Sequence, residues 1–199
     1  MTGKTVSFLS LAATAALAAT FALASGAAAQ TAPASGEDIL VLYYSDSGNT
    51  KAVAEYIHSR VGGDIAQIVA DPPYPQDRTQ KTELAKTEQS EHASHGFSAS
   101  VQDLSKYRTI IIGYPIWWGD MPMPVYGFLE ANDFSGKTVA PFCTSGGSGL
   151  GETVTKLQSS LSGAKVLDGL GVRAADAANS GEAALKWLGD SGIAVRDAG

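Results

Sequence analysis

Two kinds of hydrophobic pattern alternate along most of this chain. Unbroken apolar runs at 39–44 and 109–113 are typical of strands that are covered on both faces. Apolar residues between the runs recur at helical spacing, as at Val53, Ile57 and Val61. Strands and helices in alternation predict an α/β domain built on a parallel sheet.

The same pattern assigns the other elements. Further strands are predicted at 66–70, 137–143 and 165–167, and helices at 51–61, from Pro124, after Gly149 and after Ser180. The polar segment 82–90 is helix-prone, but its weak apolar stripe predicts a surface location. Pro141 has no N–H for a neighbouring strand, which is awkward in a central strand. Five strands with their helices predict a doubly wound parallel sheet in the order 2-1-3-4-5, over residues 38–190.

The N-terminal segment has a different composition. Residues 1–29 carry a single charge, Lys4, followed by an apolar centre and a run of small residues that ends at Ala29. This order predicts a secretory signal cleaved after Ala29, and therefore an exported protein, periplasmic or secreted; a retained membrane anchor is the alternative. Residues 30–37 are rich in Ala, Pro, Ser and Gly, which predicts a disordered tether.

The charge balance narrows the choice of partners. The chain has 14 basic and 20 acidic residues, a net charge of −6, and removal of the positive Lys4 makes it −7. A modestly acidic surface disfavours nucleic acid and favours redox partner proteins with basic docking surfaces. Cys143 is the only cysteine, so it cannot form an intrachain disulfide, and we expect a small buried hydrophobe rather than a redox thiol. We expect a monomer with no membrane span after signal cleavage.

The loop after the first predicted strand is the first candidate site, with the residues Ser45, Asp46, Ser47, Gly48, Asn49 and Thr50. A loop between a strand and a helix presents backbone N–H groups, with the positive end of the helix dipole behind them. Three hydroxyls and one side-chain amide add donors, so the loop suits a phosphate monoester. It has no lysine or arginine, which predicts recognition through neutral donors. An ordinary helix N-cap is the alternative interpretation.

Two further loops follow the predicted strands at 109–113 and 137–143, and all three reach the carboxyl edge of the sheet, where ligands bind. The second loop contains Pro115, Ile116, Trp117, Trp118 and Gly119, and the third contains Thr144, Ser145, Gly146 and Gly147. Together they suit a ligand with a phosphate at one end and a flat aromatic ring at the other, as in flavin mononucleotide (FMN). A dinucleotide is disfavoured because its glycine fingerprint is absent. Core packing is the alternative for the two tryptophans.

The residues of these loops carry a family resemblance. Residues 113–119 and 141–149, together with the loop at 45–50, resemble those of bacterial flavodoxin-like proteins, and the likeness spans most of residues 38–190. The resemblance implies that the first loop holds the FMN phosphate, the second flanks the isoalloxazine ring and the third lines its pyrimidine side. Many flavodoxins place a tyrosine in the third loop, and this chain does not. One face of the flavin is therefore expected to be open, or covered by Tyr74.

Three functions stay open. An electron carrier between protein partners is favoured; an FMN-dependent reductase of quinones with a nicotinamide donor, and an exported binding module without a redox role, are the alternatives. We find no basic patch for a nicotinamide dinucleotide. The resemblance implies that the peptide at Gly119 turns to accept a hydrogen bond from the reduced flavin, and glycine permits such a turn. Asp120 is expected to lower the flavin potential, and His92 and His95 are expected to be solvated loop residues rather than metal ligands.

Overall fold

The computed structural model describes residues 38–196, and within them strands and helices alternate as the hydrophobic pattern predicts. The strands are β1 (Ile39–Tyr44), β2 (Asp64–Ala70), β3 (Phe97–Ala99), β4 (Thr109–Pro115), β5 (Thr138–Ser145), β6 (Lys165–Val166) and β7 (Leu170–Arg173). The helices are α1 (Asn49–Val61), α2 (Arg78–Glu91), α3 (Met123–Ala131), α4 (Thr153–Ser160), the 3₁₀ helix η2 (Ala174–Asn179) and α5 (Gly181–Asp190). No helix in this part of the chain is long and apolar enough to cross a membrane. The expected signal at 1–29 and tether at 30–37 lie outside the described residues.

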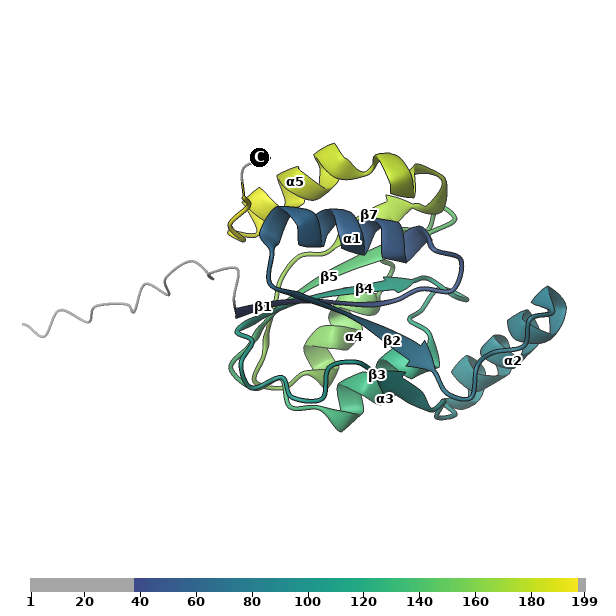
Figure 1. Cartoon of the computed structure of the whole chain (residues 1–199). Helices are drawn as coiled ribbons and strands as arrows, with labels where there is room; N and C mark the ends of the chain where they lie inside the picture. The colour runs from purple at the N-terminus through teal and green to yellow at the C-terminus, as the bar shows by residue number, and fades with distance from the viewer. Residues whose placement is uncertain (1–37, 197–199) are drawn as a thin grey trace, which may run out of the picture. The chain divides into compact units, whose positions relative to one another are not determined.

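A mostly parallel sheet forms the centre of the domain, in the order β3-β2-β1-β4-β5-β6. Alternate residues of β1 enter two separate cores, because successive side chains of a strand point to opposite faces. Ile39 and Val41 pack with α1 and α5, whereas Leu40 and Leu42 pack with α3 and α4. Figure 1 shows these two helix pairs on opposite sides of the sheet. The predicted doubly wound α/β class is confirmed.

The predicted count of five strands is wrong, because the sheet within the described residues has seven. β3 is an added edge strand that runs antiparallel to β2, in a Ser/Ala/Gly-rich stretch without an apolar run. The predicted fifth strand, at 165–167, is divided into β6 and β7, which both pair with β5. The strands β2, β1, β4 and β5 occupy the first four places of the predicted order.

Pro141 explains the division of the last strand. β6 pairs with Thr138 and Val139, whereas β7 pairs with β5 only from Phe142 onward. Leu167 N donates to Val139 O (2.8 Å), so every second residue of β5, Pro141 included, directs its backbone polar groups toward this edge. Pro141 has no N–H to donate there. The neighbouring strand is interrupted beside the one residue that could not donate to it, and β5 keeps its pairing with β4 on the other side.

Several element boundaries and one helix cap differ from their predictions, and β4 and β5 run to Pro115 and Ser145, two residues beyond their predicted ends. α1 begins at Asn49, two residues earlier than expected, and β2 begins at Asp64 rather than Ala66. Ser180 occupies the N-cap position of α5, but its hydroxyl donates to Ala177 O instead of accepting from a helix N–H. Helix and strand ends depend on hydrogen bonds that the hydrophobic pattern does not record.

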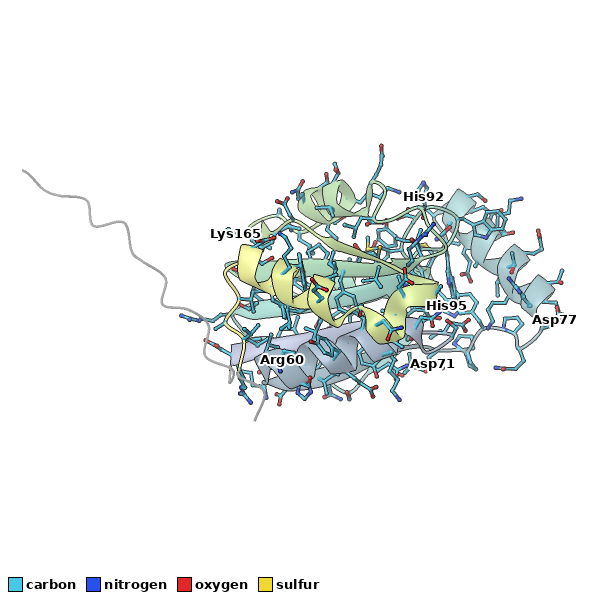
Figure 2. The ribbon with its side chains drawn as sticks, turned by 90° about the horizontal axis from the view of Figure 1, so that it is seen from above. Arg60, Asp71, Asp77, His92, His95 and Lys165 are labelled. Atoms are coloured by element: carbon cyan, nitrogen blue, oxygen red, sulfur yellow. The ribbon has the colours of Figure 1, made fainter. Side chains whose placement is uncertain are left out.

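α2 lies beyond the carboxyl ends of the strands rather than over either face of the sheet (Figure 1). Asp77 caps its start by accepting from Gln80 N (2.9 Å), and His92 ends it in the left-handed conformation. Figure 2 labels these two end residues. Along the helix only Ala85 and Glu88 are buried, so the predicted surface location is confirmed.

Candidate functional site

The first loop joins β1 to α1 and leaves a row of backbone donors without protein partners. Among the described residues, the N–H groups of 46–50 donate to no protein group, whereas Lys51 N donates to Ser45 Oγ (3.2 Å). Gly48 is the N-cap residue, with a φ of +89°, and it has no side chain with which to cap the helix. Asn49 Nδ2 donates to Ser47 Oγ (3.2 Å). The N-cap position therefore belongs to Gly48 rather than to a Ser, Asn or Thr, and the donors of 46–50 lie at the positive end of the helix dipole.

The first and third loops are joined by a buried hydroxyl contact. The hydroxyl oxygens of Thr50 and Thr144 are 2.8 Å apart, and both residues are buried. Ile116 N donates to Thr144 O (2.8 Å), which ties the second loop to the third. The three loops therefore meet at the carboxyl edge of β1, β4 and β5. The hydroxyl of Thr50 has a protein partner at this junction, unlike the backbone donors beside it.

The second loop forms a tight turn from Trp117 to Asp120. Trp117 N donates to Asp120 O (2.8 Å), and Asp120 N donates to Trp117 O (2.9 Å). Both central residues have a positive φ, +51° at Trp118 and +85° at Gly119, as in a type I′ turn. Glycine adopts this conformation readily, but a bulky residue does so only where its surroundings hold it there. The turn therefore stores strain at Trp118.

Trp118 is held in this conformation by α2. Its indole N–H donates to Thr82 O (3.2 Å), and Lys86 Nζ lies 5.0 Å from the ring centroid. The residue is nevertheless 54% exposed. Backbone strain at an exposed aromatic side chain is typical of a ligand contact rather than of core packing.

Trp117 packs against the protein instead. Its ring meets Tyr44 edge-to-face at 5.7 Å between centroids, and Tyr74 at 5.2 Å. It is half-buried at the margin of the core that contains α3 and α4. Trp117 therefore packs against the core on one side, and Trp118 is the more exposed of the two tryptophans.

The third loop folds around the hydroxyl of Ser145, which the structure places at the end of β5. Ser145 Oγ accepts from Gly147 N (3.3 Å) and from Gly149 N (3.0 Å). Gly146 is exposed and has open space where a Cβ would stand. Cys143, just before the loop, is fully buried, and burial raises the pKa of its thiol to about 11. The prediction of a buried small hydrophobe at this position is confirmed.

A cavity of about 660 Å³ opens between the first loop, the second loop and α2. Asp46 and Ser47 line it from the first loop, and Ile116, Trp117 and Trp118 line it from the second. The α2 side contributes Gln76, Arg78, Lys81, Thr82 and Ala85. Its volume lies within the range of small-molecule sites, roughly 300–1,000 Å³. The α2 residues could not be predicted from the sequence, because they form no motif and follow no apolar stripe.

Comparison with known proteins places this geometry in a family. Residues 38–189 match the sequence profile of the flavodoxins. The chain belongs to the flavodoxin family. No match was found among curated proteins.

Solved structures resemble this flavodoxin-family domain over most of their length. A protein of Bacteroides eggerthii assigned as a flavoprotein is 30% identical, with a TM-score of 0.66 over 77% of this chain and 96% of that one. A Bacteroides uniformis protein assigned in the same way is 29% identical, with a TM-score of 0.66 over 77% and 99%. A flavoprotein of Lactobacillus acidophilus, solved in complex with FMN, is 25% identical, with a TM-score of 0.57 over 73% and 99%.

Tyr74 of this flavodoxin-family domain belongs to a buried polar network. Its hydroxyl donates to Glu88 Oε2 (2.5 Å), and its ring stacks on His95 at 4.1 Å between centroids. The ring nitrogens of His95 lie 2.7 Å from Glu88 Oε1 and 2.8 Å from Pro72 O. Burial, and then the hydrogen bond to Glu88, raise the pKa of Tyr74 well above its ordinary value. Tyr74 is 6% exposed and packs edge-to-face against Trp117, so it has no free ring face for a ligand.

The expectation that His95 is a solvated loop residue is wrong. It is 8% exposed, because its ring is covered by Tyr74 and its nitrogens by Glu88 and Pro72. The local sequence does not predict the burial of His95, because its partners come from α2 and from the segment after β2. His92, by contrast, is exposed as expected. Both histidines are labelled in Figure 2.

The negative charge of Asp120 is stabilised by neighbouring donors and a cation. Its carboxylate accepts from Met121 N (2.8 Å) and from Tyr126 OH (2.9 Å), and it forms an ion pair with Lys156. Burial, and then the hydrogen bond to Asp120, raise the pKa of Tyr126 above its ordinary value. The negative charge of Asp120 is therefore balanced by Lys156, whereas its expected effect on a flavin potential stays a prediction.

The arrangement has two chemical capabilities at one edge of the sheet. The free N–H groups of 46–50 can bind an anion through neutral donors at a helix N-terminus. The exposed indole of Trp118 can stack on a flat aromatic ring. A cavity lined by both loops connects the two.

Proposed function

We propose that this protein binds FMN and passes single electrons between protein partners. The observation that carries the proposal is the row of unpaired N–H groups at 46–50, at the start of α1 and on the same edge as the exposed Trp118. Unpaired donors at a helix N-terminus favour a phosphate group, and an exposed indole favours a flat ring. The L. acidophilus relative was solved with FMN, which supports the choice of flavin.

The residues present fit FMN. Nothing lies within 4 Å of the place where a Cβ of Gly48 would stand, so the backbone donors beside it are open to a phosphate. Ser47 and Asn49 add side-chain donors, and Gly146 leaves space on the side where the family resemblance puts the pyrimidine end. FMN supplies the redox chemistry when bound, and the protein supplies binding, orientation and electrostatics.

The turn from Trp117 to Asp120 sets the surroundings of the ring. Gly119 has open space around its Cβ position and a positive φ that glycine adopts at little steric cost, and the N–H of the peptide that follows it donates to Trp117 O (2.9 Å). The hydrogen bond from Trp118 Nε1 to Thr82 O orients the indole that stacks on the ring. The ion pair of Asp120 with Lys156 balances the charge beside the turn.

A reductive titration followed by visible absorbance tests the proposal. Trp118→Ala should weaken FMN binding by about one to two decades, because stacking on an aromatic side chain is worth roughly 1–3 kcal/mol. Val195→Ala, which truncates another exposed apolar residue on the segment after α5, should bind FMN as the wild type does. FMN-loaded wild type that takes up electrons in two resolved steps supports the carrier. Wild type without affinity for FMN contradicts the proposal.

An FMN-dependent reductase is the second candidate, because of α2. Arg78 and Lys81 line the cavity beside Trp118 and supply basic side chains of the kind that a nicotinamide dinucleotide requires. A single two-electron step in the titration, with rapid oxidation of a nicotinamide cofactor in the presence of a quinone, would place this candidate first.

We also propose that the protein works outside the cytoplasm, as a monomer whose redox partner has a basic docking surface. The pattern of residues 1–29 and the acidic net charge support this. The mature protein should begin near Gln30 when its N-terminus is sequenced. Soluble cytosolic protein that keeps Met1 in its native host would contradict export.

A further inference from the structure

The first loop carries the wrong charge for a phosphate. A phosphate monoester carries about −1.5 to −2 charges at neutral pH. The first loop contains no cation, and its Asp46 lines the cavity. If the Asp46 carboxylate were uncompensated, it would repel a phosphate dianion bound in this cavity. Neutral donors alone would have to overcome that repulsion.

Lys81 brings compensating charge from α2. Its Nζ lies 2.8 Å from Asp46 Oδ1, and the two side chains are 22% and 33% exposed. Partial burial makes such a contact stronger than an ion pair in open water. Arg78, one turn earlier on the helix, lines the same cavity. Asp46, Lys81 and Arg78 together leave one net positive charge, which suits an anionic ligand.

One side of α2 faces the cavity, through Arg78, Lys81, Thr82 and Ala85. Their spacing of three, four and seven residues places them in one row along the helix. The row continues to Glu88, which meets Tyr74 and His95, and to Gln89, whose amide donates to Met121 O (3.0 Å). The inward side of α2 therefore meets a cavity and a polar network, and only Ala85 joins the core, which explains the weak apolar stripe of the helix.

We propose that Lys81, assisted by Arg78, binds the phosphate of FMN, so that α2 forms the charged wall of the phosphate site. This inference rests on the proposed FMN binding. It extends the phosphate site from the first loop to α2, for which the sequence pattern predicts a surface location but no function. The hydrogen bond between Trp118 Nε1 and Thr82 O anchors α2 beside Lys81, so the ammonium group is in place before the ligand arrives. An ammonium group has three donors, enough to contact both Asp46 and a phosphate oxygen.

Dissociation constants for FMN and riboflavin, measured by quenching of flavin fluorescence, separate phosphate recognition from ring binding. Lys81→Met should weaken FMN about tenfold, as for the loss of a charge-assisted hydrogen bond, and change riboflavin by less than about twofold. Lys165→Met makes the same charge change on β6 and should alter neither. Figure 2 shows Lys165 at the opposite end of the domain from Asp77, the cap of α2.

The Asp46→Asn background distinguishes two roles of Lys81. If Lys81 contacts the phosphate, Lys81→Met weakens FMN in this background by about tenfold or more, because the two effects are then separate. If Lys81 only neutralises Asp46, the substitution has no effect there, and that result overturns the proposal. Equal loss of FMN and riboflavin would also overturn it, since Lys81 would then act on the fold. Unchanged riboflavin binding shows that each variant is folded.

Failure of the proposed function gives a different result. Wild-type protein would then bind neither flavin, and the role of Lys81 would be rejected with it. A wild type that prefers FMN to riboflavin, combined with an unaltered Lys81→Met, would confine the failure to Lys81 and leave the phosphate to the backbone donors of 46–50.

Discussion

α1 follows β1 and α2 follows β2, and the two helices differ in what their inward sides meet. α1 lies over the sheet and buries Val53 and Ile57 in the core with β1, whereas α2 lies beyond the strands and buries only Ala85 and Glu88 (Figure 1). Apolar spacing along a helix therefore reports contact with a core. Its absence along α2 reflects polar contacts, because this helix faces a cavity and a network of charged side chains.

The largest effect is expected from Ile57→Ala in α1. Ile57 is fully buried, so its truncation should lower the free energy of unfolding by about 2–5 kcal/mol, through lost burial and the cavity left behind. Leu84→Ala on α2 is the matched control, and because Leu84 is 37% exposed it should cost less than about 0.5 kcal/mol. Urea unfolding followed by circular dichroism measures both. Similar losses of stability in the two variants would show that α1 and α2 do not differ in their contact with the core.

A smaller and more local effect is expected from Glu88→Gln. The change removes the charge that holds Tyr74 and His95, and should lower the free energy of unfolding by about 1–3 kcal/mol. Hydrogen exchange should quicken at the amides of α2 and stay unchanged in α1, because the network anchors only α2. Glu91→Gln, at the exposed end of the same helix, is the control and should change neither measurement. Equal loss of protection in α1 would show that the two helices unfold together.

The smallest effect is expected on the free energy of unfolding at alkaline pH. Burial raises the pKa of Tyr44, Tyr74 and Tyr114 above the ordinary 10.0, and that of Cys143 to about 11. A pKa that is higher in the folded state contributes stability below the unfolded pKa, and this stability is lost as the pH rises through the folded value. The free energy of unfolding should therefore stay level up to about pH 9 and then fall.

Tyr74→Phe separates the α2 network from the other buried groups. It removes one of the raised pKa values, so its free energy of unfolding should fall less steeply between about pH 9 and about pH 11 than that of the wild type. Urea unfolding at the two pH values measures the slope. A slope equal to that of the wild type would exclude a contribution from Tyr74.

Features that depend on burial could be predicted from the sequence. The apolar runs of β1 and β4 and the spacing along α1 indicate contact with a core, and these elements place the switch point of the sheet. The loop at 45–50 could be found because it directly follows β1 in the chain. Trp118 and Gly119 could be found for the same reason, as residues that follow β4.

Contacts between distant polar residues could not be predicted. The burial of His95 depends on Glu88 from α2, and the pairing of Lys81 depends on Asp46 from the first loop. Both depend on where α2 lies, which no local pattern records. β3 is similar, because its short Ser/Ala/Gly-rich segment becomes a strand only where the edge of β2 is available for pairing. The missed part of the site is therefore the part that α2 brings to it.

Pro141 also affects how this domain meets other protein chains. An exposed strand with free N–H and C=O groups is a template on which a foreign strand can add, and this leads to aggregation. Between β6 and β7, Ala140 and Pro141 of β5 have no paired strand on the side away from β4. Proline offers no donor in that gap, and Gly169 lies there against the Leu150 side chain and Pro141 O. A foreign strand therefore cannot pair with β5 in this gap. Pro141 interrupts the pairing of β5 and also prevents another chain from replacing it.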